Sequence, residues 1–252
     1  TSDAAKSFDR IIKAIVAAGG PEYKYINIDP VYNKDGGAPG ANIRPGFLYN
    51  PERVTFNAQG VISNTKAAVY EKGKLAVNPS LIDPTNVSLD SSRKPLVAQF
   101  TFKGKEVLVI ANHWNSKSGD LPVWGKVQPV TLASEKQRVE IANIVGKFVA
   151  DVKAKNPNAN IIAVGDFNDF QWSAPLKKLE SYGLYNMIHN VPSNERYTYT
   201  YQGNSQVLDH ILVSENLKAS TVIDILNVNA DFTEADGRAS DHNPLMVQVE
   251  FK

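Results

Sequence analysis

The spacing of hydrophobic positions predicts three helices in this chain. Residues 4–18 and 133–154 place apolar side chains every three or four positions, which is typical of amphipathic helices. The first of these segments is followed by a Gly-Gly-Pro sequence, which ends helices. A third, shorter helix is expected around residues 175–182.

Short apolar runs between turn-forming residues predict strands. The clearest pair covers residues 96–102 and 107–111, and the connection Lys103-Gly104-Lys105 between them predicts a hairpin. Residues 57–93 are polar and irregular, and only 74–77 in that stretch resembles a strand. The remaining predicted strands cover residues 23–28, 43–49, 54–56, 161–164, 207–213 and 245–251.

This alternation of helices and strands favours a layered α/β fold. No internal repeat or linker divides the 252 residues, and the length suffices for one large domain with a sizeable core. We therefore expect a single α/β domain over residues 1–252, with two mixed sheets packed face to face and helices outside.

Composition narrows the classes of function. The 27 Lys and Arg residues balance 26 Asp and Glu residues, whereas a protein that holds nucleic acid by charge alone is normally more basic. If nucleic acid is the substrate, the positive groups must be local to the cleft. The absence of cysteine excludes disulfides, thiolate metal sites and cysteine nucleophiles. No apolar run approaches the roughly 20 residues that cross a bilayer, so membrane insertion is not expected.

The most informative chemistry follows the apolar run at residues 161–164. Gly165 opens the end of this predicted strand, and Asp166 and Asn168 emerge where the next loop begins. A carboxylate and a carboxamide two residues apart can hold a phosphate together with a hard metal ion or its water. Alone the signal is weak, because Asp and Asn at strand ends are also ordinary turn residues.

Three other segments repeat the design of Asp, Asn or His beside a short strand, and only a folded sheet would bring all four together. These segments are Val107–Asn115, Val207–Val213 and Ala239–Pro244.

Taken together, these motifs resemble the endonuclease/exonuclease/phosphatase superfamily, whose members are similar to deoxyribonuclease I. Residues 42–54 and 112–120 most resemble bacterial extracellular nucleases. The resemblance implies a four-layer α/β sandwich and hydrolysis of phosphoesters by in-line attack of water, with a divalent metal. The motifs that carry it are Gly165-Asp166-Phe167-Asn168, Leu208-Asp209-His210-Ile211, Ser240-Asp241-His242-Asn243-Pro244 and Asn112-His113.

The resemblance also implies roles for single residues. His242 would be the base that activates water, and Asp209 would orient its imidazole and stabilise the imidazolium. Asp241 would be a metal ligand. Asp166 and Asn168 would bind the phosphate and assist the water or a second metal.

Three further residues complete the predicted site. His113 would donate to a phosphate oxygen on which charge develops. Arg44 would clamp phosphate through its guanidinium, and Asn115 would also bind substrate. The expected cofactor is Mg²⁺, with Mn²⁺ or Ca²⁺ as alternatives.

One departure from the family pattern stands out. The pattern begins with an Asn-bearing strand and a Gln-Glu strand, and that Glu is the principal metal ligand. Residues 1–19 already resemble the helix that follows these strands, so we expect a fold truncated at its N-terminus. The missing segment would then come from another chain or a larger parent chain, and the 252 residues alone would bind divalent metal weakly.

Three functions remain open. The first is a low-specificity nuclease, secreted or at the cell surface, with nucleic acid as its partner. The second is a phosphatase or phospholipase-type enzyme that acts on a small phosphoester. The third is a binding module that lacks catalysis because the Glu is missing.

Packing competes with function for several neighbouring residues. Arg138 is expected either to reach the cleft or to lie on a solvated helix face, and His210 is expected to be structural. Lys117 is a candidate for local positive charge. Packing is the favoured role of three flanking aromatic residues, with base stacking as the alternative: Trp114, Phe170 and Trp172.

Overall fold

A computed structural model describes residues 4–37, 40, 42–122 and 125–251 as a mixed α/β fold, which confirms the predicted fold class. The chain divides into two compact units. Unit 1 comprises Thr1–His113 and Asp151–Ile161, and unit 2 comprises Trp114–Ala150 and Ile162–Lys252. No helix in the described ranges is both long and apolar enough to cross a membrane.

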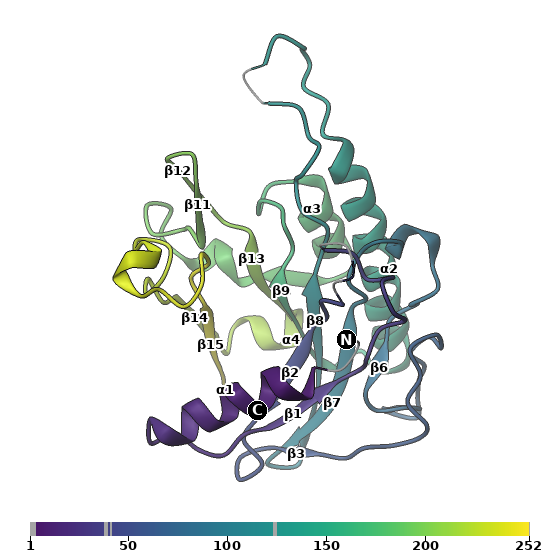
Figure 1. The fold of residues 1–252 in the computed structure, drawn as a ribbon. Coiled ribbons are helices and arrows are strands. Elements are labelled where there is room, and N and C mark those ends of the chain that lie inside the picture. The colour runs from purple at the N-terminus through teal and green to yellow at the C-terminus, as the bar shows by residue number, and fades with distance from the viewer. Residues whose placement is uncertain (1–3, 38–39, 41, 123–124, 252) are drawn as a thin grey trace. The chain divides into compact units, whose positions relative to one another are not determined.

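Unit 1 begins with helix α1 (Ala5–Ala17), as predicted (Figure 1). The helix is amphipathic, yet none of its residues is fully buried. Its main aromatic contact is Phe8, whose ring stacks on Tyr25 at 4.7 Å between centroids. Tyr25 lies in β1 (Lys24–Asn27), which pairs antiparallel with β2 (Gly46–Tyr49).

The predicted hairpin of unit 1 is confirmed. Strand β7 (Leu96–Phe102) pairs antiparallel with β8 (Lys105–His113), and β7 also pairs with the short β3 (Thr55–Phe56). The turn residues Lys103 and Gly104 both have positive φ, a conformation that favours glycine and that a tight hairpin turn needs. Apolar side chains of β7 and β3 pack with those of β1 and β2 in one part of the core: Ile26, Ala98 and Phe100, with Phe47, Tyr49 and Phe56 packed against them.

The expectation that residues 57–93 are irregular is wrong in part. This stretch contains very short strands and one 3-10 helix: β4 (Tyr70–Glu71), β5 (Lys74–Leu75), β6 (Ser80–Leu81) and η1 (Val87–Leu89). Strands of two residues carry no readable periodicity. Side-chain hydrogen bonds hold the stretch instead, since the Asn78 side chain both donates to the carbonyl of Gln99 and accepts from its N–H.

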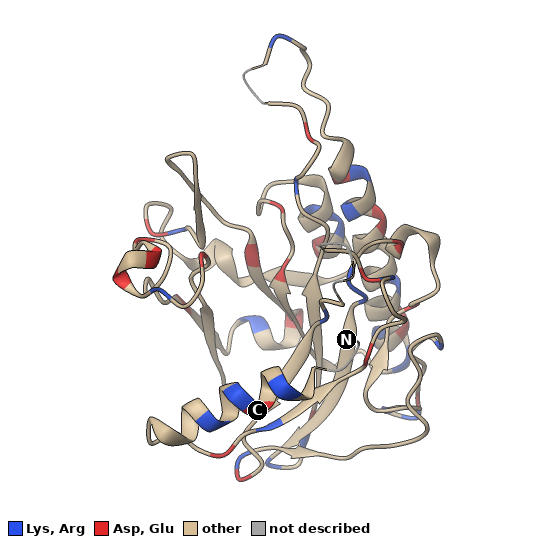
Figure 2. Cartoon of the chain, viewed as in Figure 1, with Lys and Arg blue, Asp and Glu red and all other residues tan. Residues whose placement is uncertain are grey.

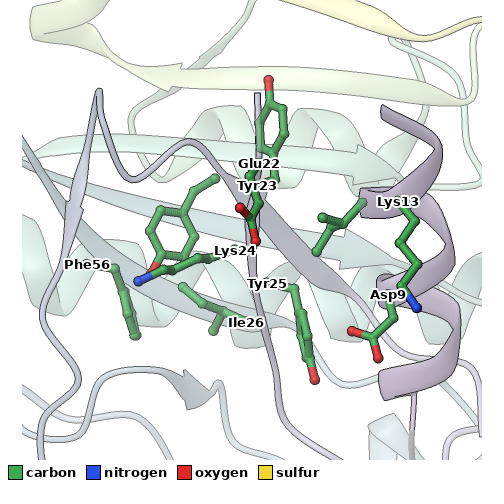
Figure 3. A pocket seen from close by; sticks show the side chains of 10 residues that line it. Asp9, Lys13, Glu22, Tyr23, Lys24, Tyr25, Ile26 and Phe56 are labelled. Carbon is green, nitrogen blue, oxygen red and sulfur yellow. The ribbon is translucent and has the colours of Figure 1, made fainter. Parts of the chain in front are cut away.

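A hollow in unit 1 lies between α1 and the strands β1 and β2 (Figure 3). Tyrosine, phenylalanine and a few charged side chains line it, including Asp9, Lys13, Tyr25 and Phe56. None of the predicted site residues is among its lining residues, so the hollow is separate from the chemistry expected from the sequence.

Unit 2 is built on antiparallel strands in the order β10 (Leu184–Asn186), β13 (Asp209–Ser214) and β9 (Asn160–Asp166). The long helix α2 (Ala133–Lys155) precedes β9, and α3 (Ala174–Ser181) follows it, both as predicted (Figure 1).

The rest of unit 2 contains elements that the hydrophobic pattern did not indicate. These are the hairpin of β11 (Tyr199–Tyr201) and β12 (Asn204–Gln206), strand β14 (Thr221–Ile225), and the short helices η2 (Met187–Asn190), α4 (Glu215–Lys218) and η3 (Glu234–Asp236). Strand β15 (Leu245–Val249) was predicted, and it pairs antiparallel with β14.

Candidate active site

The site in unit 2 starts from two aspartates that face each other across one sheet. Asp166 ends β9, Asp209 begins β13, and the two are direct partners in the antiparallel register. Figure 2 shows acidic positions at these adjoining strand ends. Because a direct cross-strand pair brings two side chains close together, the sheet places two carboxylates at one edge.

His242, from the Ser240–Pro244 motif, contacts one of these two aspartates. His242 Nδ1 lies 2.7 Å from Asp209 Oδ2, and both side chains are about one-fifth to one-quarter exposed, at 24% and 19%. A carboxylate can only accept, so Nδ1–H donates to Asp209. Nε2 is then the nitrogen that can take a proton, which is the arrangement of a general base held by a carboxylate.

Charges around the imidazole change its acidity. Burial opposes the charged ring, but the hydrogen bond to Asp209 and the negative charges of Asp209, Asp166 and Asp241 outweigh burial. The pKa of His242 is therefore raised above its ordinary value of 6.5. The same carboxylates that raise it would stabilise the imidazolium formed when the base accepts a proton.

A dense set of backbone contacts fixes the loop that carries His242. Asn229 Nδ2 donates to the carbonyl of His242 at 2.8 Å. The neighbouring Asn243 is buried, and its side-chain oxygen accepts from the N–H groups of Asn229 and Ala230 at 3.0 and 2.8 Å. Asn243 belongs to a motif read from the sequence, but no role was assigned to it there.

Thr198 links the two halves of the histidine–aspartate pair, and the sequence reasoning missed it. This fully buried residue accepts the N–H groups of Leu208 and Asp209 on its hydroxyl, at 3.1 and 3.2 Å. Its carbonyl accepts the N–H of Asn243 at 2.7 Å. The alternating Tyr-Thr-Tyr-Thr-Tyr run that contains Thr198 is the sequence signal that could have drawn attention to it.

Asp166 and Asn168 are joined by two hydrogen bonds. Asp166 Oδ1 accepts the backbone N–H of Asn168 at 2.8 Å, and its Oδ2 accepts the Asn168 side-chain amide at 3.0 Å. That amide also donates to the carbonyl of Trp114 at 3.0 Å. The side-chain oxygen of Asn168 is then the group left for substrate or metal. Asn168 has a φ of 51°, an uncommon conformation that Asn tolerates and that clusters at functional sites.

The predicted metal ligands do not gather into a complete site within the described ranges. Asp241 is exposed, and both oxygens of Asp166 are engaged by Asn168. In those ranges no group of three or more His, Cys, Asp or Glu side chains is placed to hold a metal ion. A hard cation needs more oxygen ligands than Asp166, Asn168 and Asp241 provide here.

Arg138 is not on a solvated helix face, and that alternative is wrong. Its side chain is fully buried, and Nε donates to Asp169 Oδ2 at 2.9 Å. The guanidinium also donates to the carbonyls of Asn115 and Ser116 and to the Ser134 hydroxyl. Arg138 therefore ties helix α2 to the loop that follows Asn168.

Asp169 also contacts Lys117 and His210. Lys117 Nζ lies 2.7 Å from Asp169 Oδ1, and His210 Nε2 donates to the carbonyl of Asp169 at 2.8 Å. His210 Nδ1 accepts from the Asn186 amide, which makes the ring neutral. Burial lowers the pKa of His210 to about 4, as expected for a structural histidine.

The other three predicted residues have contacts of their own. His113 ends β8 in unit 1 and directly precedes Trp114, whose N–H donates to the carbonyl of Asp166. Arg44, also in unit 1, forms an ion pair with Asp29 and donates to the carbonyl of Asn42. The Asn115 amide donates to the carbonyl of Ser134, at the start of α2. Their binding of phosphate or substrate stays a prediction.

The profile of the Endonuclease/Exonuclease/phosphatase family matches residues 66–236, well over half of the chain. The chain belongs to this family. That membership makes it a hydrolase of the phosphoesterase class. Comparison with curated protein sequences finds no match.

Solved structures share the family fold at low sequence identity. The human nocturnin catalytic domain with bound sulfate aligns with a TM-score of 0.56 and 13% identity, over 97% of this chain and 77% of that one. A humanized D. rerio TDP2 gives 0.54 and 16%, over 96% and 80%. The Bacteroides thetaiotaomicron mannosyl-6-phosphatase gives 0.51 and 20%, over 97% and 82%. At these identities the likeness concerns the fold alone.

Proposed function

We propose that this family member is a divalent-metal-dependent phosphodiesterase, and specifically a nuclease of low sequence specificity that is secreted or at the cell surface. The observation that supports the proposal best is the 2.7 Å contact of His242 with Asp209, whose cross-strand partner is Asp166. Hydrolysis of a phosphoester by water requires a base and groups that orient the water and the phosphate. Here His242 would be the base, Asp209 would orient it, and Asp166 with Asn168 would hold the phosphate.

In this mechanism His242 Nε2 accepts a proton from the attacking water. Asp209 keeps the ring in the required tautomer and stabilises its protonated form. The Asn168 side chain orients the phosphate or the water beside Asp166. His113 and Arg44 are proposed as donors to the phosphate oxygens, on which negative charge increases in the transition state.

A divalent metal, Mg²⁺ with Mn²⁺ or Ca²⁺ as alternatives, belongs to the proposal because enzymes of this superfamily generally use one. Asp241, Asp166 and Asn168 are the ligands we propose from this chain, and water and the substrate phosphate would supply the other oxygen ligands that the ion needs. When bound, the ion would polarise the phosphate and stabilise the leaving oxygen.

A phosphatase or phospholipase-type reaction on a small substrate is the second candidate. Two observations favour it: the net charge of +1, and the presence of a mannosyl-6-phosphatase among the structures of similar fold.

Hydrolysis of a substrate panel separates the two candidates. The panel contains plasmid DNA, an RNA, a phospholipid, an inositol phosphate and a sugar phosphate, each assayed in EDTA and after addition of Mg²⁺, Mn²⁺ or Ca²⁺. We expect metal-dependent cleavage of the nucleic acids only. Faster release of phosphate from a small monoester would favour the phosphatase, and no turnover of any substrate with any ion would contradict the proposed hydrolysis.

A further inference from the structure

Two exposed aromatic rings in unit 2 lie close in sequence to the residues of the candidate site. Trp172 is 61% exposed and Tyr201 is 52% exposed, so both offer a large part of their surface to solvent. Each ring stacks on a less exposed neighbour. Phe170 and Trp172 have centroids 5.0 Å apart at 21° between planes, and Tyr199 and Tyr201 have centroids 6.4 Å apart at 13°.

The pair of Phe170 and Trp172 lies in the loop that follows Asn168 and is held there by several contacts. Lys117 Nζ lies 4.4 Å from the centroid of the Phe170 ring while it bonds to Asp169. The carbonyl of Phe170 accepts the Ser173 hydroxyl at 2.6 Å, which closes the turn. Phe170 follows Asn168 by two residues, so their Cα atoms are at most about 7 Å apart.

The pair of Tyr199 and Tyr201 lies next to the proposed base, because Tyr199 contacts His242. The Tyr199 ring packs against the imidazole of His242 with centroids 4.7 Å apart, and the backbones of the two residues form a β-bridge. Burial raises the pKa of Tyr199, so its hydroxyl stays neutral beside the acidic groups. Tyr201 then extends this stack along β11 to solvent.

We propose that the two stacked pairs bind the unpaired bases of a single-stranded nucleic acid on either side of the phosphate that is cleaved. This inference rests on the proposed function and deepens it by naming the substrate form. Exposed, nearly parallel rings offer flat faces to bases of any sequence, which agrees with low specificity. The Lys117 ammonium, which is paired with Asp169, lies over the Phe170 ring and helps to hold this ring in place.

Single strands are the substrate form because the rings need free base faces. In a duplex the bases are stacked on one another, and extracting one costs free energy before it can stack on protein. Trp172 is already held by Phe170, so binding would require little ordering of the platform.

Binding of oligonucleotides in EDTA tests the proposal without turnover. The probes are a ten-residue oligothymidylate and a strand with the same number of phosphates in which abasic residues replace the nucleotides. We expect the wild-type chain to prefer the strand with bases, and Trp172→Ala to lose roughly 5- to 150-fold in affinity for it. The same variant should bind the abasic strand as the wild type does, and Trp172→Phe should recover most of the affinity.

The matched control is Phe232→Ala, because Phe232 is a 46% exposed aromatic residue of the same unit outside both pairs. Its affinity for both strands should equal that of the wild type. Equal affinity of wild type and Trp172→Ala for the oligothymidylate would overturn the inference, and so would tighter binding of a ten-base-pair duplex than of the single strand.

Failure of the stacking inference is distinguishable from failure of the proposed function. If the enzyme cleaves nucleic acid in the substrate panel while Trp172→Ala leaves binding unchanged, only the stacking inference is wrong. If no nucleic acid is cleaved in that panel, the nuclease proposal itself fails.

Discussion

At the scale of single residues, His242 is fixed through both its ring and its backbone. The ring donates to Asp209 and packs on Tyr199, and the backbone carbonyl accepts from Asn229. A histidine exposed by only 24% and held at this many points has little freedom to leave this orientation. Burial lowers the pKa of this imidazole, and the hydrogen bond to Asp209 with the nearby carboxylate charges raises it further than burial lowers it.

Replacement of Asp209 by Asn should shift the pH profile of hydrolysis. His242 must be neutral to act as a base, so activity of the wild type falls as pH drops through its raised pKa. Asp209→Asn removes the interaction that raises this pKa, and the acidic limb of the kcat/KM profile should move to lower pH while the maximum rate falls. An acidic limb that stays in place would show that another group titrates.

His210 should make the fold sensitive to mild acid. Its ring is neutral when buried, with a pKa of about 4, whereas 6.5 is the ordinary value in an unfolded chain. Between these pH values the unfolded state binds more protons, so the free energy of unfolding should fall by about 3 kcal/mol as pH drops from 6.5 to 4. Urea unfolding at both pH values should show a smaller drop in His210→Phe than in the wild type, and an unchanged drop would contradict this assignment.

At the scale of elements, a threonine before β11 connects strand β13 to the histidine loop. The Thr198 hydroxyl holds the start of β13, and its carbonyl holds Asn243 beside the base. Because Asp209 and His242 come from separate segments, their 2.7 Å contact depends on such links.

Thr198→Val should lower kcat and leave KM nearly unchanged. The variant keeps the shape of the side chain but leaves two buried N–H groups without their acceptor, at a cost of about 1–3 kcal/mol each in stability. The acidic limb of the pH profile should also shift, which a purely structural loss of folded protein would not produce. Thr200→Val is the matched control, since Thr200 lies two residues on and is exposed. Equal kcat values for the two variants would rule out a positioning role for Thr198.

Helix α2 is coupled to the loop that follows Asn168 by the buried ion pair of Arg138 with Asp169. Arg138→Met should lower the free energy of unfolding by about 3–5 kcal/mol, because it leaves the buried Asp169 with one fewer cation. Chemical denaturation measures the loss. Lys147→Met on the same helix is the control, because Lys147 is exposed and its replacement should cost less than about 0.5 kcal/mol. A small loss for Arg138→Met would mean that Lys117 alone satisfies Asp169.

The sequence predicted the long elements better than the short ones. Helix α2 and the hairpin of β7 and β8 have many periodic positions, and both were located to within a few residues. The hairpin of β11 and β12 and the strands between residues 57 and 93 were missed, because two or three residues cannot establish a period. Strand β2 begins at Gly46 rather than at residue 43 for a similar reason, since Arg44 and Pro45 interrupt the apolar run.

The sequence predicted the candidate site residues better than the residues that hold them in place. Asp166, Asp209 and His242 each stand in a short motif beside a predicted strand, so their meeting in unit 2 could be expected. The supporting contacts depend on backbone geometry that no motif encodes. Thr198, Asn243 and Arg138 act through carbonyls and N–H groups of distant residues, and their importance appears only in the folded chain.

At the scale of the whole molecule, the family fold indicates the type of reaction but not the substrate. Family membership makes the chain a phosphoester hydrolase, and structures of similar fold include both a mannosyl-6-phosphatase and a TDP2 complexed with single-strand DNA product. Exposed side chains near the candidate site in sequence, such as Trp172 and Tyr201, are where we expect substrate choice to be decided.

The most direct test of the account is turnover of a single-stranded DNA by His242→Ala, in the presence of Mg²⁺ and beside the wild type. We predict a loss of several orders of magnitude in kcat, with the free energy of unfolding unchanged within about 1 kcal/mol, because the ring is partly exposed and acts in proton transfer. His189→Ala, which removes a partly exposed histidine paired with Glu180, should retain wild-type turnover. Near-normal turnover by His242→Ala would contradict the central claim.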